Sequence, residues 1–499
     1  MSSEPGEATT LRAPDWKDRD DFRRMRDVLD AIGYTHTEVC AQLQTLDIQG
    51  ASDARQDLWR RRARGDSPRE ILIRLFLLGL TGEEAEVRRA LAPMTLEQWL
   101  QAGLLLRSGE QIWAAVHLLP AQGQTRLIYD FAPRDRAQMR PDYVMGVGAS
   151  SRTLANLTVR RPDMHTTTLD LGTGCGYQAF LAAAHSTRVV ATDRNPRAVA
   201  MVAFNAALNG LDQVVCVEGD LFAPVVGQTF DLIVSNPPFV ISPSMHYIFR
   251  DSGLPGDALC RQLVREAPEF LAEGGYCQIL CNWAHITGYD WRERLAEWAA
   301  GIGCDVWVMR SETQDAAVYA TTWIEHTEGG DRRHTTAEFD AWMEYYAAQG
   351  IEAVSAGLIT LRKARDRPHW FQADDAPTRM LGPCGAAIDQ AFAARDFLLA
   401  IGEEGLLEQP LKITPSALLE TRFAPTSEGW ALDTTHLRLR EGLAYEQEVP
   451  SAFAGFIAQC REGQRPGELL DAMDADAETR AGLLDGLRLL IARGFLLPV

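Results

Sequence analysis

The sequence predicts an α/β fold in which a doubly wound, seven-stranded sheet is flanked by mainly helical N- and C-terminal regions. Two observations lead to this prediction. Between about residues 142 and 367, short apolar runs rich in β-branched residues alternate with helical segments, which is typical of parallel βαβ units. On either side of that stretch, apolar residues recur at helical spacing. The expected domains are therefore residues 1–141, 142–367 and 368–499.

Length and composition agree with this division. The chain has 499 residues, of which 46% are hydrophobic and 23% charged, as in globular proteins of several domains. The net charge of −19 argues against a protein that coats nucleic acid by bulk electrostatics, although a local basic groove is compatible with it. No apolar stretch is long enough to span a bilayer, and the nine cysteines form no disulfide framework. We expect a cytoplasmic protein with no membrane segment and no metal site.

The N-terminal region begins with amphipathic helices and ends in short strands. Helical spacing covers residues 22–34, 69–80, 81–91 and 95–105, whereas residues 104–119 and 125–131 read as strands. Helices followed by a β-hairpin predict a winged-helix arrangement. The C-terminal region repeats the pattern more loosely, with strands expected in residues 436–447 and a helix pair ending in a strand in residues 465–499.

The central region supplies the sheet. Seven strands are expected, at residues 166–171, 188–193, 214–220, 230–235, 275–281, 304–310 and 355–363. Helices begin near Tyr177, Pro196, Gly256 and Asp290. The prolines and charges of residues 363–379 predict a linker to the C-terminal region.

Motifs that can hold a ligand follow the first four strands. Gly172, Gly174 and Gly176 form a Gly-x-Gly-x-Gly turn, which differs from the Gly-x-Gly-x-x-Gly of dinucleotide binders. Asp170 ends the first strand and can accept from an ammonium group, while Asp193 ends the second, where an acid binds ribose hydroxyls. Because strand ends of a doubly wound sheet open on one crevice, we expect these motifs to converge with "EGDLF" (218–222) and "SNPPF" (235–239).

The stretch from Asp170 to Phe239 resembles the class I S-adenosylmethionine-dependent methyltransferases, specifically the small methyltransferase domain group with an Asn-Pro-Pro-Phe/Tyr motif. That group includes release-factor glutamine methyltransferases and ribosomal RNA guanine methyltransferases. The resemblance implies a Rossmann-like methyltransferase sheet and S-adenosyl-L-methionine as the cofactor. It also implies that residues 145–161 cover the cofactor. The cofactor-binding residues that it implies are Asp170, Gly172, Thr173, Gly174 and Gly176 for the methionine part, Asp193 for the ribose, Asp220 and Leu221 for the adenine, and in addition Arg194 and Asn236.

The catalytic prediction concerns Asn236, Pro237, Pro238 and Phe239. A planar amide or aromatic amine is a poor nucleophile, because its lone pair is delocalised. If the Asn236 side-chain oxygen and the Pro237 carbonyl each accept one N–H, the nitrogen is held with its lone pair towards the methyl group. Phe239 would stack on the flat target, and the two prolines would fix both acceptors. The alternative, a turn that only ends a strand, is disfavoured by the preceding motifs.

The motif selects a type of nitrogen and leaves several acceptors open. An exocyclic base amine in RNA, plausibly ribosomal, is favoured by the expected winged helices, and a glutamine amide of a protein such as a translation factor is the alternative. DNA, a small-molecule amine and an inactive scaffold rank lower. The partner is thus expected to be a macromolecule, while the oligomeric state is not predicted. Tyr247, Phe249 and Arg250 are candidates for the substrate mouth. An arginine-lined groove there would favour RNA, and a neutral or apolar slot would favour a peptide.

Overall fold

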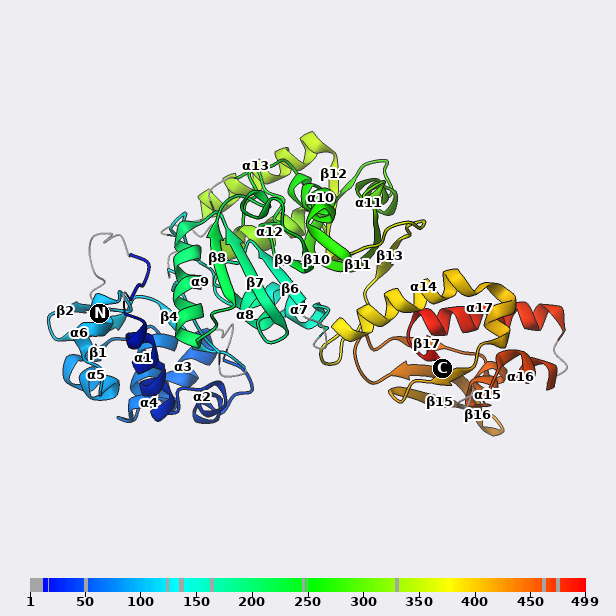
Figure 1. Cartoon of the computed structure of the whole chain (residues 1–499), viewed down its shortest axis with the longest axis horizontal. Coiled ribbons are helices and arrows are strands. Elements are labelled where there is room, and N and C mark those ends of the chain that lie inside the picture. Colours follow the sequence, from blue (N-terminus) through cyan, green and yellow to red (C-terminus); the bar gives the residue numbers. More distant parts are fainter. Residues whose placement is uncertain are drawn as a thin grey trace. The chain divides into compact units, whose positions relative to one another are not determined.

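The computed structural model describes residues 12–16, 18–48, 53–122, 125–133, 139–161, 166–244, 247–248, 250–327, 332–459, 464–472 and 476–499 (Figure 1). The chain forms two compact units. Unit 1 comprises Met1–Leu154 and Arg161–Asp374, and unit 2 comprises Ala155–Arg160 and Asp375–Val499. The expected domain boundaries at residues 141 and 367 stay predictions.

Unit 1 is built on an eight-stranded sheet with the order β13-β11-β12-β10-β9-β6-β7-β8. Strands β6 to β10 run parallel to their neighbours within that group, and β12 is antiparallel to both β10 and β11. The α/β prediction is thereby confirmed, and each of the seven expected strands is present. The strands are β6 (Thr166–Leu171), β7 (Ser186–Asp193), β8 (Val214–Glu218), β9 (Phe230–Ser235), β10 (Leu271–Ile286), β11 (Cys304–Asp315), β12 (Ile351–Lys363) and β13 (Phe371–Asp375).

The eighth strand, β13, lies in the segment that was expected to be a linker, so that prediction is wrong for Phe371–Asp375. The backbone N–H of Val306 in β11 donates to the Trp370 carbonyl at 2.9 Å, and the Trp307 indole donates to Asp374 at 2.9 Å. Proline and charge content had suggested a loop. An edge strand tolerates both, because only one of its sides must pair.

Helices cover both faces of the sheet. One face packs against α8 (Tyr177–Ala182), α9 (Pro196–Asn209) and the N-terminal region in a single apolar core. The other packs against α10 (Ala258–Glu266) and α11 (Trp291–Ala299). Two further helices, α12 (Ala316–Thr327) and α13 (Arg332–Gln349), connect β11 to β12. From β6 the chain continues to β7 and β8, and β9 then returns on the other side of β6, which opens a crevice at the carboxyl ends of β6 and β9.

The N-terminal region contributes helices, a π-helical turn and short strands. A three-stranded antiparallel sheet has the order β1-β3-β2, and β4 pairs with β5. Whether this region is a winged helix stays a prediction. Its elements are α1 (Arg19–Ala31), α2 (His36–Leu43), α3 (Asp53–Arg62), α4 (Pro68–Leu72), η1 (Ile73–Leu77), β1 (Gly82–Glu83), α5 (Glu84–Leu91), α6 (Leu96–Gln101), β2 (Leu105–Ser108), β3 (Gln111–Ala114), β4 (His117–Pro120) and β5 (Arg126–Tyr129), followed by α7 (Ala149–Leu157).

Strand β5 is joined to α9 by two asparagine side chains that act as a further strand would. The Asn205 amide accepts from the Ile128 N–H at 2.7 Å and donates to the Ile128 carbonyl at 3.1 Å. Asn209 makes the same pair of bonds to Arg126, at 2.8 and 2.7 Å. These bonds satisfy backbone groups that would otherwise be buried without partners.

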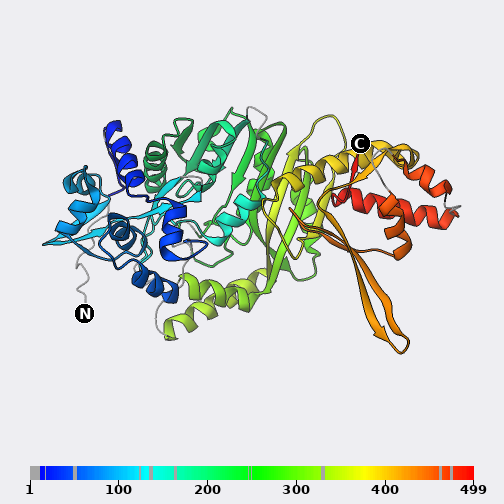
Figure 2. The ribbon, with the colours of Figure 1, turned by 90° about the horizontal axis from the view of Figure 1, so that it is seen from below.

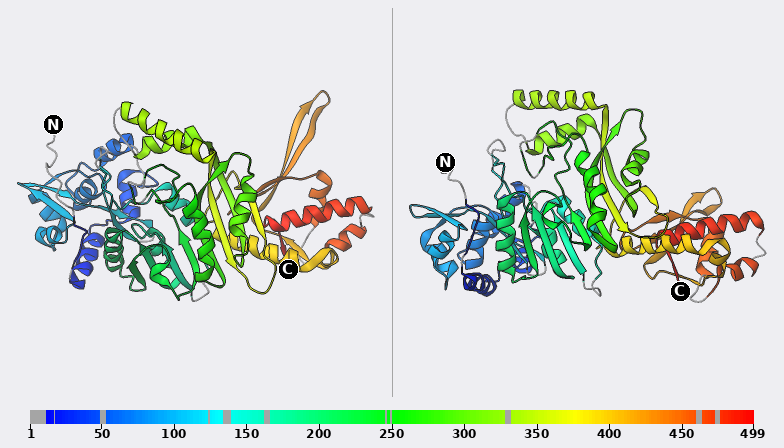
Figure 3. Two further views of the ribbon diagram at one scale, coloured as in Figure 1. Left: turned by 90° about the horizontal axis from the view of Figure 1, so that it is seen from above. Right: turned by 45° about the horizontal axis from the view of Figure 1, so that its top comes forward.

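Unit 2 combines a long helix, two small sheets and a helix pair. Helix α14 is interrupted at Gly402, whose φ of 65° is left-handed. A long hairpin, β15–β16, was not expected from the sequence, and Figures 2 and 3 show it extending beyond the rest of the unit. The C-terminal strand was expected and is present. The elements are α14 (Gly385–Glu408), β14 (Leu411–Ile413), β15 (Ala417–Thr426), β16 (Gly429–Leu439), β17 (Glu446–Glu448), α15 (Ser451–Gln459), α16 (Pro466–Ala472), α17 (Ala477–Ala492) and β18 (Leu496–Pro498).

Candidate active site

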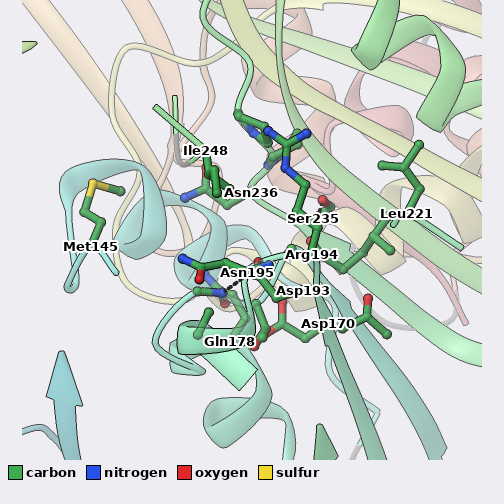
Figure 4. Close-up of a pocket in the computed structure, with 18 of the residues that line it drawn as sticks. Met145, Asp170, Gln178, Asp193, Arg194, Asn195, Leu221, Ser235, Asn236 and Ile248 are labelled. Carbon is green, nitrogen blue, oxygen red and sulfur yellow. Dashed lines mark hydrogen bonds between the residues drawn. The ribbon is translucent and has the colours of Figure 1, made fainter. Parts of the chain in front are cut away.

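A cavity of about 300 Å³ opens where the carboxyl ends of β6, β7, β8 and β9 meet (Figure 4). Its volume falls in the range of small-molecule sites. Most of the residues singled out from the sequence line it. They are Asp170, Gly172, Thr173, Gly174, Asp193, Arg194, Asp220, Leu221, Asn236, Pro237 and Pro238. Gly176 and Phe239 are not among the lining residues.

The glycine turn gives the cavity its floor. Gly172 and Gly174 have φ values of 72° and 57°, and a Cβ added at either position would meet no atom within 4 Å. The turn is held by the Thr192 carbonyl, which accepts from the N–H groups of Gly172 and Thr173, both at 2.9 Å. At these two positions glycine therefore serves the backbone conformation and leaves space open above it.

Gly176 has a different role from the other two glycines. It precedes α8 with a φ of 87°, and a Cβ there would run into the ring of Phe180. Its small size is required by packing against the helix. The expectation that it binds a cofactor directly thus has no support from the lining of the cavity, since its neighbours Cys175 and Tyr177 are the residues that face it.

Asp170 is buried at the end of β6. Its Oδ2 accepts from the Thr173 hydroxyl at 2.6 Å and from the Ala179 N–H at 2.9 Å. Burial raises the pKa of Asp170 to about 7, because the desolvation of the carboxylate outweighs these two hydrogen bonds. A cation bound beside Asp170 would restore the charged form, so the site favours a ligand with an ammonium group.

Asp193 ends β7 and faces the same cavity. Its Oδ2 accepts from the Gly174 N–H at 2.9 Å, and its Oδ1 accepts from the Asn195 N–H at 2.8 Å. Burial raises the pKa of Asp193 as well. Beyond β8, Asp220 is exposed and Leu221 has a left-handed φ of 45°, which turns the chain at the rim of the cavity.

Asn236 follows β9, and only the nitrogen of its side-chain amide has hydrogen-bond partners among the described residues. Its Nδ2 donates to the hydroxyls of Ser150 at 3.2 Å and Ser151 at 3.4 Å. Its Oδ1 is buried and accepts no hydrogen bond from any residue that the structure describes. A buried acceptor without a donor is costly unless a ligand supplies one, so this oxygen marks the place where an N–H is expected to bind.

Phe239 lies apart from the cavity. It is half buried and packs between the core on the α10 side of the sheet and a second core formed with α12 and α13. In this structure the ring therefore faces other apolar side chains, which does not support the expectation that it stacks on a flat acceptor.

The segment after the motif is folded back on itself. Arg250, expected at the mouth, is 0% exposed in its side chain and pairs with the buried Asp251 at 2.6 Å. The expectation that Arg250 faces the substrate mouth is thus wrong, because the guanidinium is buried inside the loop, where Ser244 also accepts from it at 3.0 Å. Tyr247 is buried. Phe249 lies outside the described residues.

Sequence reasoning found only part of the segment that covers the cavity, since the expected cover includes Met145 and Gly146 but not Tyr143 and Val144. Tyr143, Val144, Met145 and Gly146 line it from the segment between β5 and α7. Asp130 holds this segment, because its backbone N–H and its carboxylate both bond to Val144, at 3.1 and 2.9 Å. The only signal in the sequence was the expected cofactor cover at residues 145–161, which begins two residues too late.

Asp130 is itself fixed by a buried ion pair. The Arg197 Nε of α9 donates to its carboxylate at 2.9 Å, and both side chains are buried. Removing one partner of a buried ion pair strongly destabilises the protein, because the other charge is left buried without compensation. The N-terminal region thus helps to position the cover of the cavity through the backbone and the carboxylate of Asp130.

The charges around the cavity are few. Among the lining residues that the structure describes, Arg194 is the only cation, and Asp170, Asp193 and Asp220 are the only acids. The apolar surface of the cavity includes the side chains of Met145, Ile248, Leu254 and Leu259. No group of three metal-binding side chains and no helix able to cross a membrane occurs in the described part of the chain.

Comparison with known proteins assigns the central region to a family. Residues 147–287 match the model of the Methyltransferase small domain, which confirms the resemblance drawn from the motifs. The flanking regions match two models described only as domains of unknown function, DUF7059 at residues 32–115 and DUF7782 at residues 389–498.

Named relatives match about a quarter of the chain. The release factor glutamine methyltransferase of Xylella fastidiosa (strain 9a5c) is 34% identical over 149 residues, which are 27% of this chain and 54% of the relative. The ribosomal protein uL3 glutamine methyltransferase of Bradyrhizobium diazoefficiens is 37% identical over 126 residues, 22% of this chain and 40% of the relative. The chain thus spans about half the length of these relatives. A solved methyltransferase structure from Pyrococcus furiosus aligns with 48% of this chain and 89% of its own at 16% identity and a TM-score of 0.27.

Proposed function

We propose that this protein transfers a methyl group from S-adenosylmethionine to the side-chain amide nitrogen of a glutamine in a protein. The observation that carries this proposal is the unpartnered Oδ1 of Asn236 in the cavity wall. An amide NH₂ offers two N–H groups, and the Asn236 oxygen with the Pro237 carbonyl offers two acceptors from adjacent residues.

The residues of the cavity fit the cofactor. The raised pKa of the buried Asp170 suits an ammonium group, and Asp193 lies where ribose hydroxyls can donate to its free lone pairs. Asp220 and Leu221 would border the adenine, and the segment Tyr143–Gly146 would cover the bound molecule. S-adenosylmethionine, when bound, supplies an electrophilic methyl group on a sulfonium sulfur.

The chain's own residues orient the nucleophile. Asn236 Oδ1 accepts one N–H of the glutamine amide and the Pro237 carbonyl accepts the other, so that the nitrogen lone pair points towards the methyl carbon. The new N–C bond forms as the S–C bond breaks. The nitrogen then carries an acidic proton, which passes to water, so a strong general base is not required.

A protein acceptor is favoured over RNA by the charges at the cavity. A single arginine among the lining residues does not make the basic groove that an RNA backbone requires, whereas neutral and apolar side chains suit a peptide loop. The named relatives also act, by their names, on protein glutamines. The exocyclic amine of an RNA base, preferred from the sequence, is therefore not supported and becomes the second candidate.

The test uses radiolabelled S-adenosylmethionine with purified release factor, ribosomal protein uL3 and ribosomal RNA as separate acceptors. We expect label in a protein, and mass spectrometry of its peptides should locate one added methyl group on a glutamine. Label in RNA, or label in no acceptor, would overturn the proposal.

A further inference from the structure

A hairpin of unit 2 carries an apolar face that the described chain leaves uncovered. In the β15–β16 ladder, Phe423 pairs directly with Leu432, and Pro425 pairs with Trp430. Opposite partners and alternate residues of a strand point to the same side, so these four side chains share one face. Phe423 is 57% exposed, Trp430 74% and Leu432 48%.

This face continues from the core of unit 2. Nearer the base of the hairpin, Leu437 and Leu439 of β16 point to the same side and are buried with Leu406 and Phe456. Leu419, which pairs with Leu437, is already 43% exposed. Further out, the two strands extend away from the rest of the unit (Figure 2), and the register keeps Phe423, Leu432, Pro425 and Trp430 on the same side as Leu437.

The reverse face of the hairpin carries charged side chains that can remain solvated. There Arg438 pairs with Glu420 at 3.5 Å, and Arg422 pairs with Glu446 at 3.4 Å. The inner part of the hairpin is thus amphipathic, and further out the reverse face carries only the small side chains of the Ala424–Ala431 pair. A two-stranded ribbon gains little stability by itself, so an exposed row of large apolar side chains on it is typical of a surface that binds a partner.

We propose that this face docks the protein that is methylated, through an apolar surface flanked by lysine or arginine. This inference rests on the proposed function for the identity of the partner. The charge preference comes from Glu428 and Asp433, which are exposed next to the apolar face and have no ion-pair partner among the described residues. With a chain charge of −19, nucleic acid and anionic lipid surfaces are poor partners.

The exposed area of the face favours an acceptor protein over a second copy of the chain as the partner that binds there. Its large side chains expose on the order of 400 Å², whereas a stable complex buries roughly 800 Å² on each partner. Two copies joined through this face alone would form a weak dimer. An acceptor is held at the active site as well, so a small second contact is sufficient to raise its affinity.

The experiment compares three full-length proteins for binding to purified release factor and to purified ribosomal protein uL3. The test variant is Phe423→Thr with Trp430→Thr, which replaces the two aromatic side chains by a β-branched residue that strands also favour. The matched control is Ala424→Ser with Ala431→Ser, a directly opposed pair on the reverse face. Circular dichroism and thermal melting check that all three are folded alike.

We expect the wild type and the control to bind one of the two probes equally, and the test variant to bind it at least tenfold more weakly. The KM for that acceptor should rise by a similar factor, while S-adenosylmethionine affinity and kcat at saturating acceptor stay unchanged. A second pair, Glu428→Gln with Asp433→Asn, should weaken binding several-fold and reduce its dependence on salt.

Binding decides this inference, and methylation decides the proposed function. Equal binding by the test variant and the wild type overturns the docking role, even if a glutamine is methylated. Failure of the wild type to bind either probe overturns it as well. A wild-type dimer that dissociates in the test variant would identify a second copy as the occupant. Binding that depends on the hairpin, without any methylation, would support the docking role and overturn the proposed reaction.

Discussion

Replacing Asn236 with alanine separates chemistry from cofactor binding and from stability. The lost oxygen is proposed to hold the acceptor nitrogen, and removal of one such oriented group costs roughly 10²- to 10³-fold in rate, about 2.7–4 kcal/mol. The side chain makes no hydrogen bond to Asp170, Asp193 or the glycine turn. Turnover should therefore fall by that factor, while the affinity for S-adenosylmethionine changes little.

The structure also gives the expected change in stability. The two bonds from Nδ2 to Ser150 and Ser151 are long, at 3.2 and 3.4 Å, and together contribute on the order of 1 kcal/mol. Against this loss, alanine removes a buried Oδ1 that has no donor, which relieves roughly 1–3 kcal/mol. The melting temperature should stay the same or rise slightly.

The assays are calorimetry with S-adenosylmethionine, initial rates at saturating acceptor, and thermal melting. Asn236→Asp is the informative companion, because it keeps an acceptor oxygen and should retain part of the activity. Wild-type turnover in Asn236→Ala would refute the role of the oxygen. Parallel losses of rate, cofactor affinity and melting temperature would instead mean that the residue only ends the strand.

Three further predictions concern the groups around this oxygen. Ser150→Ala with Ser151→Ala frees the amide to rotate, so kcat should fall several-fold with unchanged cofactor affinity, measured by the same rate and calorimetric assays. Burial holds Asp170 protonated below a pKa of about 7 in the free protein, so affinity for S-adenosylmethionine should rise with pH up to about 7 and then level off. A calorimetric pH series tests this, and Asp170→Asn should remove the dependence; a flat wild-type profile would contradict it. Gly146→Ala would push the cover of the cavity off the Tyr129 ring, lowering cofactor affinity several-fold, and a second change, Tyr129→Ala, should restore part of it.

The central sheet was predictable because its signals are local. Strands buried on both faces read as continuous apolar runs, and each of the first four expected strands is followed by a glycine turn, an acid or the Asn-Pro-Pro motif. The order of a doubly wound sheet then brings those ends together without any further information. This is why eleven of the thirteen residues proposed for the site line one cavity. Gly176 and Phe239 were assigned by position in the motif, which does not say which way a residue faces.

The cover of the cavity and the hairpin were not predictable in the same way. Val144 is held by Asp130, fourteen residues away, and Asp130 by Arg197, 67 residues away, so no local pattern links them. In the hairpin, an extra residue at Asp433 interrupts the period-2 alternation of β16, and Pro425 in β15 suggests a turn. Arg250 was misjudged because the sequence shows Asp251 beside it but does not show that both side chains are buried and paired inside the loop.

The contacts of α9 show how the N-terminal region acts on the site. Asn205 is fully buried, and the same Nδ2 that donates to Ile128 of β5 also donates to the Cys175 carbonyl in the glycine turn, both at 3.1 Å. Two residues after Ile128, Asp130 follows the end of β5 and fixes the segment covering the cavity. The glycine turn below the cavity and the segment that covers it are thus both connected by hydrogen bonds to β5 or to the residue that follows it. A movement of that strand changes the two sides of the cofactor site together, so the N-terminal region contributes to the geometry of the reaction as well as to any choice of acceptor.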